Sequence, residues 1–175
     1  MSRHPSWAVD RPQSERHDLT EEEVKVYLDV SCLNRPFDDQ EQARIRLEAA
    51  AVGMILERMD EGLWTHVSSE MAMIEIDANR DPKRRARVRL LLPAAANLVI
   101  LTQAMFTRAE ALGKYGFKPA NALHLAAAEE AKVDVLLSCD DRFCRAAHRH
   151  AKLLRLPVRN PLDWLNEVED AADSG

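Results

Sequence analysis

The sequence predicts an α/β protein in which helices cover both faces of a central, mainly parallel sheet. From Val24 onward, short apolar runs of strand type alternate with longer segments of helical periodicity. Strands separated by helices run parallel, because the chain crosses back over the sheet before each new strand begins. The 175 residues, 46% of them hydrophobic, suit a single core. We therefore expect one three-layer α/β/α sandwich.

Five runs carry the strand pattern, being short, apolar and bounded by polar or turn-forming residues. They are residues 24–30, 64–67, 98–101, 133–139 and 156–158. Asp29 is a polar break near the end of the first run, and the Asn34-Arg35-Pro36 sequence that follows predicts a loop rather than a helix.

Apolar residues at three- and four-residue spacing, together with capping residues, predict the helices. Ser68 or Ser69 is the expected cap of one helix and Thr102 of another, while Pro82 and Pro119 stand where a first helical turn begins. The predicted helices are residues 42–60, about 69–78, a segment from 82, 102–113, a segment from 119, 141–152 and 161–168. The expected organisation is a flexible N-terminal extension at 1–23, a domain at 24–168 and a C-terminal tail at 169–175.

Charge and cysteine content narrow the function classes. A net charge of -5 predicts no general attraction to nucleic acid, so any RNA contact needs a local basic patch. The three cysteines include no Cys-x-x-Cys pair, which argues against a disulfide framework and a structural zinc site and favours a reducing cytoplasm. We expect neither a signal peptide nor a membrane span.

Two aspartates stand where strands are predicted to end. Asp29 and Asp140 each follow an apolar strand, and ligands of parallel sheets bind at the carboxyl ends of strands. Two such carboxylates repel each other unless a cation or solvent lies between them. Capping of the following helix explains Asp140 as well, whereas Asp29 precedes a predicted loop.

Two further positions are less distinctive by themselves. Glu75 lies among apolar residues of a predicted helix, and a solvated edge position explains it equally well. Asn121 lies in the first turn after Pro119, one turn before His124 on the same side of the helix.

Taken together, these residues resemble a known family. Four segments, residues 27–38, 68–75, 116–128 and 136–143, are similar in content and order to the motifs of PIN domains, the fold of VapC-type toxin ribonucleases. The resemblance covers about residues 24–168. It implies an acidic site made by Asp29, Glu75, the position of Asn121, and Asp140. Beside it, Asp141 is expected as a further metal ligand and Ser138 as a substrate contact.

The resemblance also implies a chemistry and partners. Oxygen ligands of this kind suit Mg²⁺ or Mn²⁺, which activate water for hydrolysis of RNA phosphodiester bonds. An antitoxin protein and a homodimer are the implied partners. One position departs from the family pattern: Asn121 stands where the family has Asp, so the ion should bind more weakly. A natural weakening and a deliberate inactivating change both explain it.

Basic residues near these motifs are candidates for phosphate contact. Arg35 and Lys118 lie closest to the expected ligands in the sequence. A second set forms a stripe on one predicted helix face, which a solvated surface explains equally well: Arg142, Arg145, Arg149 and Lys152.

Other function classes lack their signatures. His148 and His150 do not share a helix face, which argues against zinc, and neither a Gly-x-Ser-x-Gly elbow nor a phosphate-binding glycine loop is present. A receiver domain would place its acidic pair after the first strand, and a haloacid-dehalogenase phosphatase needs Asp-x-Asp there. The remaining alternative is a catalytically impaired PIN-like module that binds RNA or protein.

Overall fold

A computed structural model describes residues 22–175, so all but the end of the expected N-terminal extension lies outside the described residues. In this part of the chain, five parallel strands form the central sheet in the order β3-β2-β1-β4-β5. The strands are β1 (Val24–Leu28), β2 (Trp64–Ser69), β3 (Leu98–Val99), β4 (Val135–Leu137) and β5 (Val158–Arg159). The predicted strand positions and their parallel direction are confirmed, although β3 and β5 are only two residues long.

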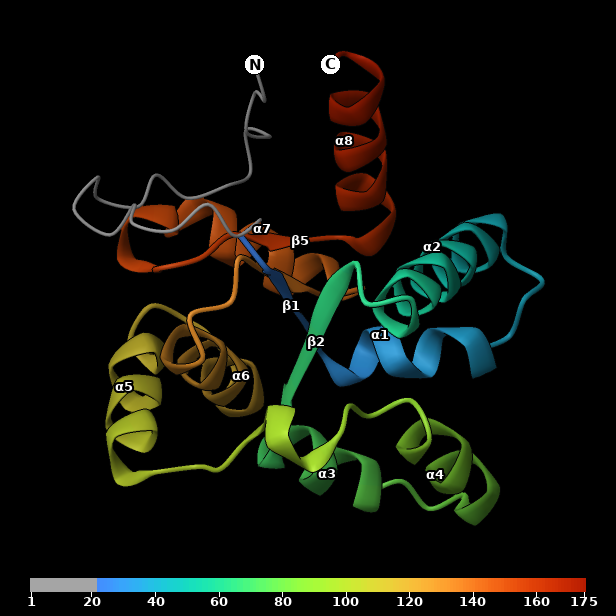
Figure 1. Ribbon diagram of the computed structural model, residues 1–175. Coiled ribbons are helices and arrows are strands. Elements are labelled where there is room, and N and C mark those ends of the chain that lie inside the picture. The colour runs from blue at the N-terminus through green and yellow to red at the C-terminus, as the bar shows by residue number, and fades with distance from the viewer. Residues whose placement is uncertain (1–21) are drawn as a thin grey trace.

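Within residues 22–175, eight α-helices connect and cover the strands (Figure 1). They are α1 (Val30–Asn34), α2 (Ala43–Asp60), α3 (Glu70–Asp77), α4 (Pro82–Arg89), α5 (Gln103–Gly113), α6 (Pro119–Glu130), α7 (Asp141–Arg149) and α8 (Pro161–Asp173). Short 3₁₀ turns η2, η3 and η4 span Arg35–Phe37, Ala95–Asn97 and Ala151–Leu153. None of the helices in residues 22–175 is long and apolar enough to span a membrane.

Two cores lie on opposite faces of the sheet, because successive side chains of a strand alternate between faces. Tyr27 and Leu136 pack with α5, α6 and α7 in one core. Val26 and Leu28 pack with α1, α2 and Trp164 of α8 in the other. Figure 1 shows α5 and α6 side by side on one side of the sheet and α1 and α2 on the other. The arrangement confirms the three-layer α/β/α prediction.

Three helix boundaries differ from the sequence prediction. The loop predicted after Asp29 is wrong: α1 begins at Val30, because the Asp29 side chain accepts a hydrogen bond from the Cys32 amide and caps it. A helix of five residues is too short to show a periodic pattern. At the other end, α7 stops at Arg149, and α8 continues to Asp173 through most of the segment predicted as a tail.

Candidate active site

The candidate site lies where β1 and β4 end side by side. Leu28 pairs with Leu137, and the Asp29 amide donates to the Leu137 carbonyl at 3.1 Å. Ser31 joins the two strand ends, since its hydroxyl accepts from the Cys139 amide at 2.9 Å and lies 3.3 Å from the Ser138 hydroxyl. Parallel pairing thus brings together two segments that are more than 100 residues apart in the chain.

Asp29 is a buried carboxylate with no ion-pair partner among residues 22–175. Its side chain is 4% exposed and accepts from the Ser31 hydroxyl at 2.5 Å and the Cys32 amide at 3.1 Å. Burial raises the pKa of Asp29, while His124 and the hydroxyls of Ser31 and Ser138 oppose that rise. A cation beside this carboxylate would offset the cost of burying its charge.

Glu75 of α3 is anchored by a chain of buried polar groups. Its Oε1 atom lies 2.8 Å from Nε2 of His124, and Nδ1 of His124 lies 2.6 Å from the Tyr27 hydroxyl. Tyr27 in turn contacts the Ser69 hydroxyl at 2.6 Å. Burial raises the pKa of Tyr27, so its phenol stays protonated and can donate one hydrogen bond. The sequence predicted that Ser68 or Ser69 caps this helix. Ser69 does occupy the capping position of α3, but its side chain bonds Tyr27 and makes no capping hydrogen bond.

Asp140 and Asp141 face different partners. Asp140 caps α7 by accepting from the amides of Arg142 at 2.9 Å and Phe143 at 3.2 Å. Helix capping was the alternative explanation that the sequence offered for this residue. Both oxygens of Asp141 accept from the guanidinium of Arg44, and these hydrogen bonds lower the pKa of the Asp141 carboxyl. The ligand role predicted for Asp141 therefore requires Arg44 to leave.

Asn121 and Asp140 line one pocket of about 310 Å³ between α6 and α7. Four basic side chains line the same pocket: Lys118, Arg142, Arg145 and Arg149. The other described residues of the lining are a glycine, an alanine and two phenylalanines. The pocket thus combines two oxygen ligands with a positive wall, which suits a phosphate group bridged by a cation.

Two residues predicted to contact substrate are engaged elsewhere. Nε of Arg35 lies 2.7 Å from Glu48, and its Nη1 lies 3.1 Å from Asp38. Ser138 is fully buried and accepts from the Asp140 amide at 3.1 Å. Proximity in the sequence favoured Arg35 over the basic stripe, but three members of that stripe, Arg142, Arg145 and Arg149, line the pocket. The fourth member, Lys152, lies in η4 beyond the end of α7 and is not among the lining residues. A spacing of three and four residues was the only sequence signal for Arg145 and Arg149.

The donor chemistry fits a divalent cation better than the donor positions do. The hard oxygens that Mg²⁺ and Mn²⁺ prefer are offered by Asp29, Glu75, Asn121 and Asp140, and the buried Asp29 has no ion-pair partner among residues 22–175. Within residues 22–175, however, no three His, Cys, Asp or Glu side chains gather into one group suited to a metal ion. Hydrogen bonds hold the three acids, and the fourth candidate ligand, Asn121, is an amide instead of an acid.

The site geometry agrees with a comparison against family profiles. The profile described as PIN domain matches residues 26–149, which span β1 to the end of α7 and all four candidate ligands. No curated protein matches the chain. The match covers more than half of the sequence and accords with the parallel sheet and its acidic strand ends. The chain therefore belongs to the PIN domain family.

Proposed function

We propose that this chain is a cytoplasmic, metal-dependent endoribonuclease that hydrolyses RNA phosphodiester bonds. PIN domains are typically metal-dependent nucleases, with Mg²⁺ as the usual ion. The observation that carries the proposal is the pocket shared by Asn121, Asp140 and four basic side chains. Two serine hydroxyls, those of Ser31 and Ser138, connect this pocket to the buried Asp29. The free cysteines accord with a reducing compartment.

Each residue has a distinct part in the proposed reaction. Asp29, Glu75, Asn121 and Asp140 would hold Mg²⁺ or Mn²⁺, which would lower the pKa of a bound water and offset charge on the phosphate. Lys118 and Arg142 would contact the RNA backbone, with Arg145 and Arg149 extending that contact along α7. Ser138 orients the Asp140 backbone, and Arg35 joins the turn η2, which follows α1, to Glu48 of α2.

His124 gives the proposed site a positioning group. Because Tyr27 contacts one ring nitrogen of His124 and Glu75 the other, the imidazole orientation is determined at both ends. The Glu75 carboxylate is 30% exposed, so one oxygen can face solvent while the other stays bonded to His124. Glu75 therefore keeps a defined direction before any ion arrives.

A ribonuclease assay with matched variants tests the proposal. We expect Asn121→Asp to bind Mn²⁺ about tenfold more tightly and to cut single-stranded RNA faster, because a full negative charge and bidentate ligation return. Asp29→Asn should abolish cutting, and Asp39→Asn, an exposed acid outside the site, should leave it unchanged. Calorimetry measures Mn²⁺ binding separately from cleavage.

A second candidate function rests on Asn121 and on the dispersed acids. A PIN-like module with an impaired ion site would bind RNA or protein without cutting. Mn²⁺ binding by Asn121→Asp without RNA cleavage would favour this module, whereas unchanged Mn²⁺ affinity would overturn the site assignment itself.

The resemblance to VapC-type toxins extends the proposal to a toxin role, with an antitoxin protein and a homodimer as partners. We expect expression of the Asn121→Asp form to arrest bacterial growth and to degrade cellular RNA. Growth arrest that persists with Asp29→Asn added would contradict a nuclease toxin.

A further inference from the structure

The second strand of the sheet has an open edge along its first half. β3 pairs with Ser68 and Ser69 alone, so no strand formed by residues 22–175 lies beside the part of β2 that begins at Trp64. The other edge of β2 pairs with β1. Open strand edges offer unpaired backbone groups to an incoming extended chain.

The ladder pattern shows which backbone groups point outward. In a parallel pair, alternate residues turn both their N–H and C=O toward the same neighbour. The Lys25 N–H donates to the Asp134 carboxylate and the Lys25 C=O accepts from the Asp134 amide, so both groups point to the β4 side. The N–H and C=O of the next residue, Val26, therefore point to β2, where Val26 is paired with His66. Val26 then bonds the residues that flank His66. The N–H and C=O of His66 consequently point to the open edge.

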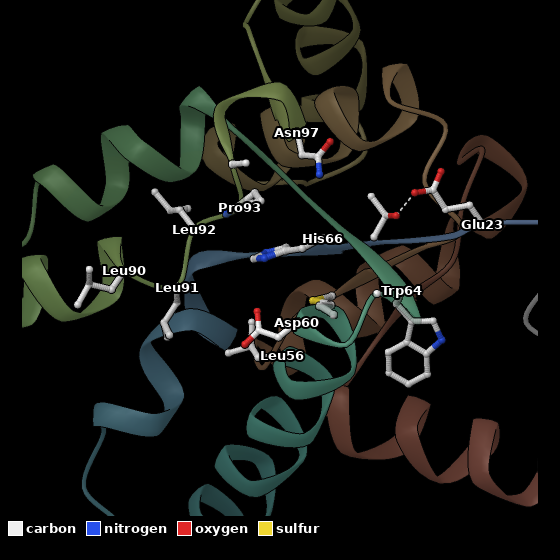
Figure 2. A pocket seen from close by; sticks show the side chains of 14 residues that line it. Glu23, Leu56, Asp60, Trp64, His66, Leu90, Leu91, Leu92, Pro93 and Asn97 are labelled. Atoms are coloured by element: carbon white, nitrogen blue, oxygen red, sulfur yellow. Dashed lines mark hydrogen bonds between the residues drawn. The ribbon is translucent and has the colours of Figure 1, made fainter.

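A pocket of about 500 Å³ runs along this edge (Figure 2). Thr65 lines it from one face of β2, while Trp64 and His66 belong to the other face, as strand alternation requires. Lining residues from both faces place the pocket at the edge of the strand. Its opposite wall is the apolar segment 90–94, in which Leu90 is 84% exposed.

His66 contributes a buried polar atom that no described residue partners. The residue is 9% exposed, and its Nε2 atom has no hydrogen-bond partner among residues 22–175. Figure 2 shows the imidazole extending from β2 toward the segment that carries Leu91 and Pro93. Buried polar atoms are usually satisfied, so an unmatched one inside a pocket indicates a missing ligand group.

The charges of the pocket select the class of ligand. Among residues 22–175, Glu23 and Asp60 are its charged lining residues, and no lysine or arginine of this range lines it. The candidate RNA pocket has the opposite character, with four basic side chains. The open-edge pocket therefore disfavours nucleic acid and favours a basic partner.

We propose that this pocket binds an extended peptide segment of a partner protein, which adds a strand to the open edge of β2. The peptide backbone would bond the N–H and C=O of His66, an apolar side chain would pack on Leu91 and Leu92, and a flanking Lys or Arg would pair with Asp60. A polar group of the peptide would meet Nε2 of His66.

The test uses the full chain labelled with ¹⁵N and a set of acetylated, amidated pentapeptides. All carry Lys at both ends and Val beside the centre, and the central residue is varied over Leu, Ile, Met, Phe, Tyr and Trp. We expect at least one peptide to shift the His66 amide signal with a Kd of about 1 mM or tighter. Its counterpart with Glu at both ends should bind at least tenfold more weakly, and N-methylation of the peptide backbone should abolish binding.

Charge reversal in the protein supplies the matched control. Asp60→Lys should weaken the Lys-ended peptide and strengthen the Glu-ended one, while Glu110→Lys, an exposed site on α5, should change neither. The proposal is overturned if no peptide shifts the His66 amide at about millimolar concentration, or if N-methylation has no effect. It is also overturned if an RNA oligonucleotide shifts that amide more strongly, or if dilution of the protein alone does, which would indicate a second copy of the chain.

Discussion

At the scale of single residues, a buried chain of hydrogen-bonded side chains connects the core to the candidate site. It runs from Ser69 through Tyr27 and His124 to Glu75. Tyr27 and His124 are 0% and 1% exposed, so each of their polar atoms depends on a protein partner. An aromatic side chain at position 27 is needed for the core, but only the phenol also bonds His124. The hydroxyl is therefore the part of Tyr27 that serves the site.

Tyr27→Phe should separate these two parts. We expect a loss of about 1–3 kcal/mol in the free energy of unfolding, because Nδ1 of His124 and the Ser69 hydroxyl lose their partner. Urea unfolding measures the loss. Tyr115→Phe, at a half-exposed tyrosine, is the control and should change stability by less than about 0.5 kcal/mol. Equal losses in both variants would contradict the buried chain.

His66 predicts how stability depends on pH. Burial lowers the pKa of His66 to about 4, against an ordinary value of 6.5. Between these values the unfolded chain binds a proton that the folded chain does not, so stability falls as pH drops from 6.5 toward 4. The contribution over this range is about 3 kcal/mol. His66→Gln should flatten the fall measured by denaturant unfolding, whereas His148→Gln, at an exposed histidine of α7, should retain it.

At the scale of elements, the candidate ligands are also parts of helix starts. Asp29 caps α1 and Asp140 caps α7, so the same carboxylates organise the backbone and carry the charge of the site. Buried Glu48 joins segments in a related way, since it meets Arg44 of its own helix α2, Arg35 of the turn η2 and Asn160 at the start of α8. Loss of activity in an alanine variant would therefore mix a structural effect with a chemical one.

Two substitutions at position 140 separate these effects. Asp140→Asn keeps a side-chain oxygen for the amides of Arg142 and Phe143, and Asn caps helices about as well as Asp. We expect its thermal stability to stay near that of the parent while Mn²⁺ affinity falls. Asp140→Ala should in addition lose about 1 kcal/mol of stability. If Asp140→Asn retained full Mn²⁺ affinity, Asp140 would be a cap and no more.

At the scale of the whole molecule, charge is distributed unevenly. The chain has a net charge of -5, yet the pocket at Asp140 is lined by four basic side chains and the pocket at the open edge of β2 by two acids. The two pockets therefore favour ligands of opposite charge. Binding at the first should depend on a few local contacts rather than on overall attraction.

Salt titration measures how many phosphates are contacted. With up to four cations at single-stranded RNA, the logarithm of affinity should fall against the logarithm of salt concentration with a slope of about -2 to -3. Arg145→Ala should lower the magnitude of that slope by about 0.7, because one phosphate contact is lost. Arg80→Ala, at an exposed arginine outside the pocket, should leave the slope unchanged. A slope that is the same for both variants would contradict phosphate binding by α7.

The sequence by itself determined the fold class, the order of strands and helices, and the positions of Asp29 and Asp140 after β1 and β4. These features depend on local periodicity and capping, which neighbouring residues encode. The short helix α1 escaped prediction because five residues carry too little periodicity, although the Asp29 cap was present in the sequence.

Only the tertiary structure decided which residues meet. It paired Arg44 with Asp141, turned Arg35 toward Glu48, linked Glu75 to Tyr27 through His124, and left an open edge on β2. Each of these depends on contacts between segments far apart in the chain. No local pattern encodes such contacts, because strand order and helix packing must be settled before distant side chains compete for the same partners.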